Sequence, residues 1–141
     1  MAKKVYKLKG LQPESFRVIC IASHQNHYRL SWAINNVLEI YLRQSDDLVI
    51  RHSKANIDQR FSKYSFRKDS LPVLYHLISN KSEQGFLLKE LPNIDYFLKV
   101  VGELEDQEFI NIINKIKNLD IVITAFELKP ISNVQSKKLT F

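Results

Sequence analysis

Two apolar segments near the C-terminus flank an amphipathic one. Residues Ile94–Val101 and Ile121–Leu128 are rich in β-branched and aromatic side chains, which is typical of β-strands. Asp106 is a predicted N-cap for the segment between them. Its apolar residues recur at helical spacing: Phe109, Ile112, Ile113 and Ile116. The pattern predicts a β-α-β unit, which requires a sheet with a helix packed on it.

The first third of the chain repeats this order of elements. Phe16–Ser23 is predicted to be a strand, and the periodicity changes to helical near Asn26. The predicted buried stripe of this helix consists of Leu30, Ile34, Val37 and Tyr41. A polar break at residues 44–47 is expected to precede a short strand at Leu48–Ile50.

The middle of the chain is rich in strand signals. Residues Arg60–Lys68 alternate, with Tyr64 and Phe66 on one face, and Val73–Ser79 is apolar on both faces, as in a central strand. Residues 80–85 are expected to form a turn or loop. We therefore predict an α+β fold: an antiparallel or mixed sheet with two helices on one face and a ferredoxin-like or ACT-like β-α-β…β-α-β element order. A different α+β meander would have the same elements, and the strand order stays open.

Composition narrows the class of protein. A chain of 141 residues with 45% hydrophobic residues is expected to form one ordered domain spanning 1–141. Its single cysteine, Cys20, lies in an apolar run and is predicted to be a buried core thiol. No segment matches a signal peptide or a membrane span, so we expect a cytoplasmic protein without a membrane partner.

The segment Leu88–Tyr96 (LKELPNIDY) is similar to a known family signature. This segment resembles the signature of the bacterial IPExxxVDY proteins: Glu90, Asp95 and Tyr96 match, whereas Lys89 replaces the proline of the family. Three further segments are similar to the family: His27–Leu30, Leu77–Lys81 and Leu139–Phe141. The resemblance implies a bacterial cytoplasmic protein and carries no activity, cofactor or catalytic residue.

The signature residues form the first candidate site. Glu90 and Asp95 would serve as a carboxylate pair for a cation, an amine or acid–base work. In the structural interpretation, which we favour, Asp95 accepts hydrogen bonds from nearby backbone amides while Tyr96 packs with its hydroxyl bonded. We predict no catalytic, cofactor-binding or metal-binding residue. His24 and His27 alone are too few for a structural metal site, and no glycine-rich phosphate loop is present.

Six cations lie between residues 51 and 68: Arg51, Lys54, Arg60, Lys63, Arg67 and Lys68. Phe61, Tyr64 and Phe66 are interleaved with them, as in proteins that bind single-stranded nucleic acid. Alternation places Tyr64 and Phe66 opposite Lys63 and Arg67. We therefore favour rings that face the core and charges that face water.

Trp32 is the candidate interface residue. It lies roughly 160–200° around the helix from the Leu30–Ile34 stripe when 100° is counted per residue. Exposed tryptophans often anchor interfaces, although the chain's own termini would also be able to cover this one. The leading hypothesis is a non-catalytic binding or adaptor domain acting through a protein partner or self-association. The alternatives are a small-molecule-binding ACT-like regulatory module, RNA binding by residues 51–68 and, last, an enzyme using Glu90 and Asp95.

Overall fold

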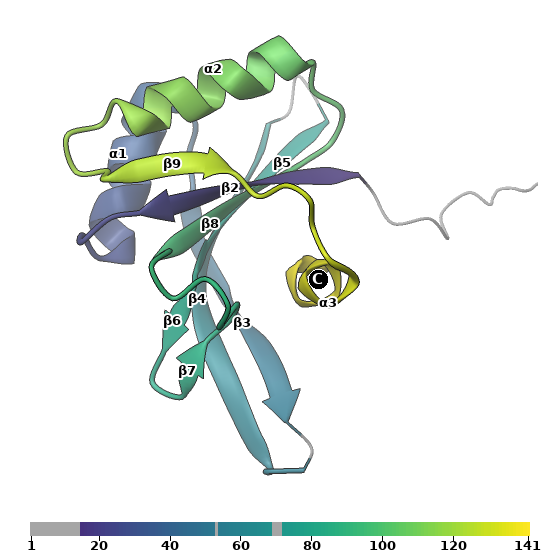
Figure 1. The fold of residues 1–141 in the computed structure, drawn as a ribbon. Coiled ribbons are helices and arrows are strands. Elements are labelled where there is room, and N and C mark those ends of the chain that lie inside the picture. Colours follow the sequence, from purple (N-terminus) through teal and green to yellow (C-terminus); the bar gives the residue numbers. More distant parts are fainter. Residues whose placement is uncertain (1–14, 53, 69–71) are drawn as a thin grey trace, which may run out of the picture.

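The computed structural model describes residues 15–52, 54–68 and 72–141. Within these residues the fold is α+β, with a six-stranded antiparallel sheet, a two-stranded hairpin and three helices (Figure 1). The elements are β2 (Phe16–Ala22), α1 (His27–Leu38), β3 (Arg43–His52), β4 (Ile57–Lys68), β5 (Val73–Ser79), β6 (Lys81–Ser82), β7 (Gly85–Phe86), β8 (Tyr96–Val101), α2 (Asp106–Lys117), β9 (Thr124–Glu127) and α3 (Asn133–Leu139).

The sheet has the strand order β3-β4-β5-β8-β2-β9, and every neighbouring pair is antiparallel. The three central strands, β5, β8 and β2, are those whose sequences are apolar on both faces. β8 and β9 both pair with β2, which lies between them. The two strands of the predicted β-α-β unit, β8 and β9, are therefore not neighbours. Strand β2, from an earlier part of the chain, lies between them.

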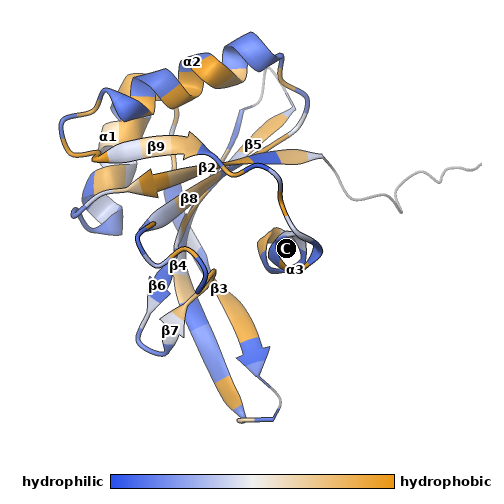
Figure 2. Cartoon of the chain, viewed as in Figure 1, coloured by the Kyte–Doolittle hydropathy of each residue, from blue (hydrophilic) through white to orange (hydrophobic). Residues whose placement is uncertain are grey.

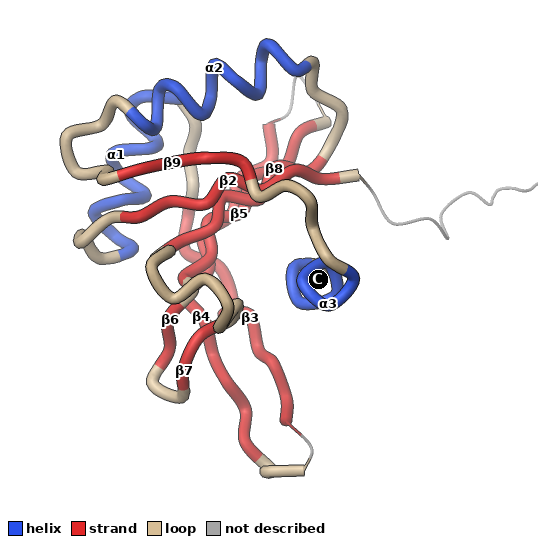
Figure 3. The backbone as a smooth tube through the Cα atoms, viewed as in Figure 1, coloured by secondary structure: helices blue, strands red, loops and turns tan. Residues whose placement is uncertain are grey.

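Helices α1 and α2 cover one face of the sheet, as Figure 3 shows in blue against the red strands. Leu30 and Ile34 of α1 and Phe109 and Ile116 of α2 are fully buried against strand residues such as Leu98. Figure 2 shows hydrophobic and hydrophilic residues mixed along both helices, as expected of helices with one buried side. The predicted pair of helices on one face is thus confirmed.

A second apolar cluster covers the opposite face of the sheet. Phe61, Phe97 and Leu139 are fully buried in it, together with Leu87 and Leu88 of the segment that follows the hairpin. α3 lies on this side of the sheet, away from α1 and α2 (Figure 1). Neither α3 nor the β6–β7 hairpin was expected from the sequence, where residues 80–85 were predicted to be a turn or loop.

Strand β3 is longer than predicted. Residues 44–47 were expected to be a polar break before a short strand at Leu48–Ile50, yet they lie inside β3. Ser45 pairs with Lys63 and Leu48 with Phe61, so β3 advances three residues while β4 advances two. A β-bulge accommodates Asp46 and Asp47 without ending the strand. Both strands of the β3–β4 hairpin were predicted in part, and the structure places them at one end of the sheet, beyond β5.

Three element ends differ from the expectation. α1 ends at Leu38, where Glu39 adopts a left-handed conformation with φ of 56°, so Tyr41 lies beyond the helix and is exposed instead of joining the buried stripe. The residue before α2 is Glu105, so Asp106 is the first helical residue and not the N-cap. β9 begins at Thr124 instead of Ile121.

No helix within the described part of the chain is long and apolar enough to cross a membrane.

Candidate functional site

The segment that carries the family resemblance lies between the β6–β7 hairpin and β8. Glu90 and Asp95 both line a pocket of about 590 Å³, together with His24, Lys81 and several apolar residues. The buried Asn80 shapes this segment: its amide donates hydrogen bonds to the carbonyls of Leu91 and Ile94. Asn80 lies in the Leu77–Lys81 segment that resembles the family, but no pattern in the sequence indicates that its side chain is buried.

Asp95 connects two distant parts of the fold. Its Oδ2 accepts a 2.8 Å hydrogen bond from the backbone N–H of Ser23, and its Oδ1 lies 2.7 Å from Nζ of Lys81. Ser23 is buried, so its N–H would otherwise lack a partner. Asp95 therefore accepts a backbone amide, as the structural interpretation expects, although this amide is 72 residues away in sequence.

Tyr96 is buried and donates a 2.6 Å hydrogen bond from its hydroxyl to the carbonyl oxygen of Gln25. Burial, with a smaller contribution from the charge of Asp95, raises the pKa of Tyr96 to about 12. The phenol therefore stays protonated at neutral pH and keeps its donor role. Asp95 and Tyr96 together bind the β2–α1 connection to the start of β8.

Glu90 is exposed and contacts α3. Its Oε2 accepts a 2.8 Å hydrogen bond from Nε2 of Gln135, and this bond is the main cause of a pKa below the usual glutamate value. Gln135 also completes a capping box with Ser132 at the start of α3. The two carboxylates of the predicted pair thus line one pocket while each is engaged with a different element of the fold.

Trp32 lies on the outer side of α1 with 62% of its surface exposed, and Tyr28, one turn earlier, is 69% exposed. We call these two side chains the aromatic face of α1. A pocket of about 420 Å³ adjoins them and is also lined by Asn26 and Arg29. Trp32 is therefore uncovered by the described residues, including the C-terminal segment that was one alternative; the N-terminal segment, the other alternative, lies outside the described residues. Tyr28 was not among the predicted interface residues, because the helical period was used only to identify the buried side of the helix.

The six cations between residues 51 and 68 do not share one surface. Lys63 and Arg67 lie on one side of β4, with Phe61, whereas Arg60 and Lys68 lie on the other, with Tyr64. Arg51 forms an ion pair with Asp58, and Lys54 lies in the turn between β3 and β4. The contiguous cationic surface that RNA binding requires is thus divided by the sheet.

The expectation that the charges of β4 face water holds for Arg60 and Arg67, which are exposed, but needs correction for Lys63. Tyr64 and Phe66 do pack against the α1–α2 side, as predicted. The opposite side is also covered, because Phe61 is fully buried there and Lys63 lies over the Phe141 ring, 4.6 Å from its centroid. The alternation of side chains along β4 shows which residues share a side of the strand. It does not show that a later segment of the chain, here the one ending in Phe141, covers one of these sides.

A buried lysine, Lys99, was not singled out by sequence. It is 4% exposed in β8, with its ammonium 4.1 Å from the ring centroid of Phe141 and 4.6 Å from that of Phe16. His76 pairs with Lys99 across the sheet and bonds Ser65 through Nδ1 at 2.6 Å, as expected of a partly buried histidine. The signal that the sequence offers for Lys99 is its position inside the otherwise apolar centre of β8.

The cysteine and the two histidines named in the sequence lie in different environments. Cys20 is fully buried, as predicted, and burial raises the pKa of its thiol to about 12. His27 contacts the hydroxyl of Tyr64 through Nδ1 at 2.9 Å, while His24 is exposed. Across the residues that the structure describes, no group of three or more His, Cys, Asp or Glu side chains is arranged to hold a metal ion.

No protein-family model matches the sequence, and a search of the curated proteins finds no match either.

Proposed function

We propose that this protein is a non-catalytic binding domain that contacts a protein partner through the aromatic face of α1. The observation that carries the proposal is the composition of one exposed pocket, which is lined by Trp32, Tyr28, Arg29 and Asn26. Trp, Tyr and Arg are the three residue types most enriched among side chains that dominate binding energy at interfaces. Here all three lie within five residues on one helix.

The helix holds these side chains in place. Leu30 and Ile34 anchor the opposite side of α1 in the core, and the side chain of Asn26 caps the helix by accepting from the N–H of Arg29. Aromatic side chains on a rigid helix lose little conformational freedom when a partner binds. Two rings that are more than 60% exposed also leave apolar surface for a partner to bury.

We infer in addition that the sheet is a ferredoxin-like core with an added hairpin. Support comes from the partial order β9-β2-β8-β5, in which antiparallel pairing separates the strands of each β-α-β unit. Both helices pack on the same face, and β3 and β4 extend the sheet beyond β5. Membership of the IPExxxVDY family remains a proposal that rests on the residues around Glu90 and Tyr96.

Substitution of the aromatic face tests the proposed function. We would identify nuclease-resistant partners by affinity capture from the native host, then measure binding of the purified partner to wild-type protein and to Trp32→Ala and Tyr28→Ala. Loss of an interface anchor is expected to weaken binding by about 2 kcal/mol or more, which is roughly thirtyfold. Light scattering at increasing concentration tests self-association with the same variants.

Tyr41→Ala is the matched control, because Tyr41 is equally exposed but lies beyond the end of α1. It is expected to bind and assemble like the wild type. The proposal is wrong if Trp32→Ala and Tyr28→Ala bind the partner and associate as the wild-type protein does. Trp32 is the only tryptophan, so its fluorescence reports directly on whether a partner covers it.

A further inference from the structure

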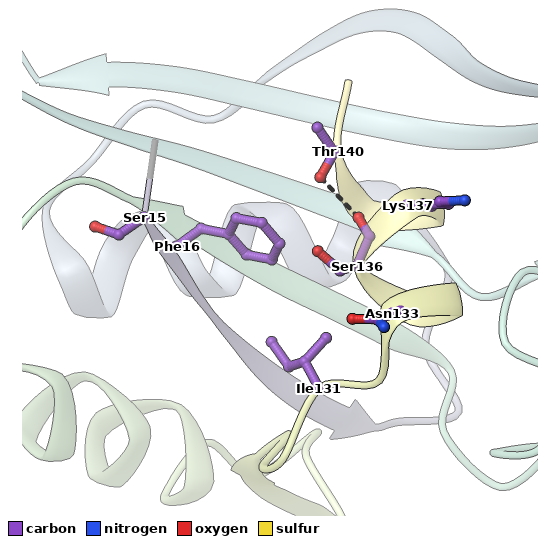
Figure 4. A pocket seen from close by; sticks show the side chains of 7 residues that line it. All are labelled: Ser15, Phe16, Ile131, Asn133, Ser136, Lys137 and Thr140. Carbon is purple, nitrogen blue, oxygen red and sulfur yellow. Dashed lines mark hydrogen bonds between the residues drawn. The ribbon is translucent and has the colours of Figure 1, made fainter. Parts of the chain in front are cut away.

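Two adjoining pockets lie on the α3 side of the sheet, away from the aromatic face of α1. The smaller has a volume of about 270 Å³, and the larger about 610 Å³. Phe16 and Thr140 line both, so the two pockets are neighbours at these residues. Figure 4 shows Phe16 of β2 facing the inner side of α3 across the larger pocket.

The smaller pocket is cationic. Arg67, Lys99 and His76 line it, and they come from three adjacent strands whose register brings them to one side of the sheet. Lys63 lies beside it, because Lys63 and Lys99 both lie over the ring of Phe141. Among the described residues that line either pocket, none has an acidic side chain.

The electrostatic environment of His76 agrees with this arrangement. Burial is the main cause that lowers its pKa to about 4, and the charges of Lys99 and Lys63 lower it further. His76 is therefore neutral at pH 7. Arg67 is exposed and forms no ion pair with another described residue. A guanidinium in this state matches two oxygens of a phosphate group.

The larger pocket has a different chemistry. Ser15, Asn133 and Ser136 line it, and their side chains form no hydrogen bond with the rest of the described chain. The hydroxyl of Thr140 already donates to the carbonyl of Ser136 at 2.7 Å (Figure 4). The polar groups that remain are of the kind that bind hydroxyl groups of a ligand.

We propose that the two neighbouring pockets bind a small phosphate monoester with a hydroxylated body, of the sugar-phosphate class. The phosphate lies between Arg67 and Lys99, and the hydroxylated body extends along α3 towards Ser136 and Asn133. A monoester carries nearly two negative charges at neutral pH, which suits a pocket lined by Arg67 and Lys99 better than a single carboxylate does. The site is independent of the protein contact at α1, because it lies on the opposite side of the sheet.

Titration calorimetry of the full chain tests the site with ribose 5-phosphate, glucose 6-phosphate and glycerol 3-phosphate. At least one is expected to bind saturably, and more tightly than inorganic phosphate or the unphosphorylated sugar. Arg67→Gln should weaken that binding about ten- to a hundredfold, because a charge-assisted hydrogen bond is lost. Arg60→Gln is the matched control, since Arg60 is an exposed arginine on the other side of β4.

The Ser136→Ala variant distinguishes binding of the hydroxylated body from binding of the phosphate group. It should weaken binding of the sugar phosphate while leaving that of inorganic phosphate unchanged. Amide shifts on titration with the sugar phosphate should centre on Phe16, Arg67 and Thr140, which gives a second measurement that needs no variant. The proposal is overturned if none of the three esters binds saturably, if Arg60→Gln weakens binding as much as Arg67→Gln, or if inorganic phosphate binds as tightly as the esters.

Discussion

The carboxylate of Asp95 accepts a 2.8 Å hydrogen bond from the buried backbone N–H of Ser23, and this bond ties the end of β2 to the start of β8. The same carboxylate forms an ion pair with Lys81, whose side chain is half exposed. The two contacts differ in their expected energies. A buried amide without its acceptor is costly, whereas an ion pair with a half-exposed lysine contributes little.

Asp95→Ala is therefore expected to lower the free energy of unfolding by about 1–3 kcal/mol. Lys81→Ala, which removes only the ion pair, should change it by less than about 1 kcal/mol. Asp95→Asn keeps an oxygen for Ser23 and should fall between the two. Urea denaturation measures all three, and equal losses for Asp95→Ala and Lys81→Ala would contradict this assignment.

Leu139 is the residue that docks α3. It is fully buried in the cluster that includes Leu87 and Leu88, whereas Val134 on the same helix is 63% exposed. Leu139→Ala should cost about 2–5 kcal/mol of unfolding free energy, and Val134→Ala within about 0.5 kcal/mol. Hydrogen exchange of the α3 amides should rise in the first variant alone. Unchanged exchange in Leu139→Ala would show that other contacts hold the helix.

His76 makes stability depend on pH. The pKa of this residue is about 4 in the folded protein against a reference of 6.5, so between these values the unfolded chain binds more protons than the folded one. Stability should therefore be fully present above pH 6.5 and fall as the pH is lowered towards 4, by about 3 kcal/mol in total at 1.36 kcal/mol per unit.

His76→Gln removes this proton linkage, and urea denaturation between pH 4 and pH 7.5 measures the difference. The variant is expected to lose less stability than the wild type on acidification across that range. Parallel pH profiles for the two proteins would contradict a buried, neutral His76. The groups that face this histidine are Ser65, Lys63 and Lys99, so its neutral form is favoured by both burial and charge.

Gly102 cannot accept a side chain. Its φ is 124°, and a Cβ atom there would lie 2.6 Å from the carbonyl oxygen of Pro72. Gly85 has a similar φ of 120°, but a Cβ atom there would meet only the side-chain amide of Gln59, at 3.5 Å. Gly102→Ala should thus cost more than about 1 kcal/mol and more than Gly85→Ala, because backbone cannot yield as a side chain can. Thermal denaturation ranks the two, and equal losses would contradict the clash.

Much of the fold was predictable where one segment carries a strong period of its own. β5 is apolar on both faces and proved to be a central strand, and the stripe from Phe109 to Ile116 gave α2. α3 has no such signal: it is seven residues long, and of its side chains Leu139 alone is fully buried. Its capping box depends on Gln135, which also reaches Glu90 across 45 residues of sequence.

The amino-acid sequence by itself determined those strands and helices that have a clear period of their own, such as α1, α2, β5 and β8, since side-chain periodicity is a local property. It also determined that Trp32 has no place in the buried stripe of α1. Only the tertiary structure decided which strands are neighbours, that a bulge carries β3 past Asp46 and Asp47, and that Phe141 meets Lys63, His76 and Lys99. These relationships join residues tens of positions apart in the sequence. They arise when apolar faces of distant segments are buried together, so a short segment of sequence contains no information about them.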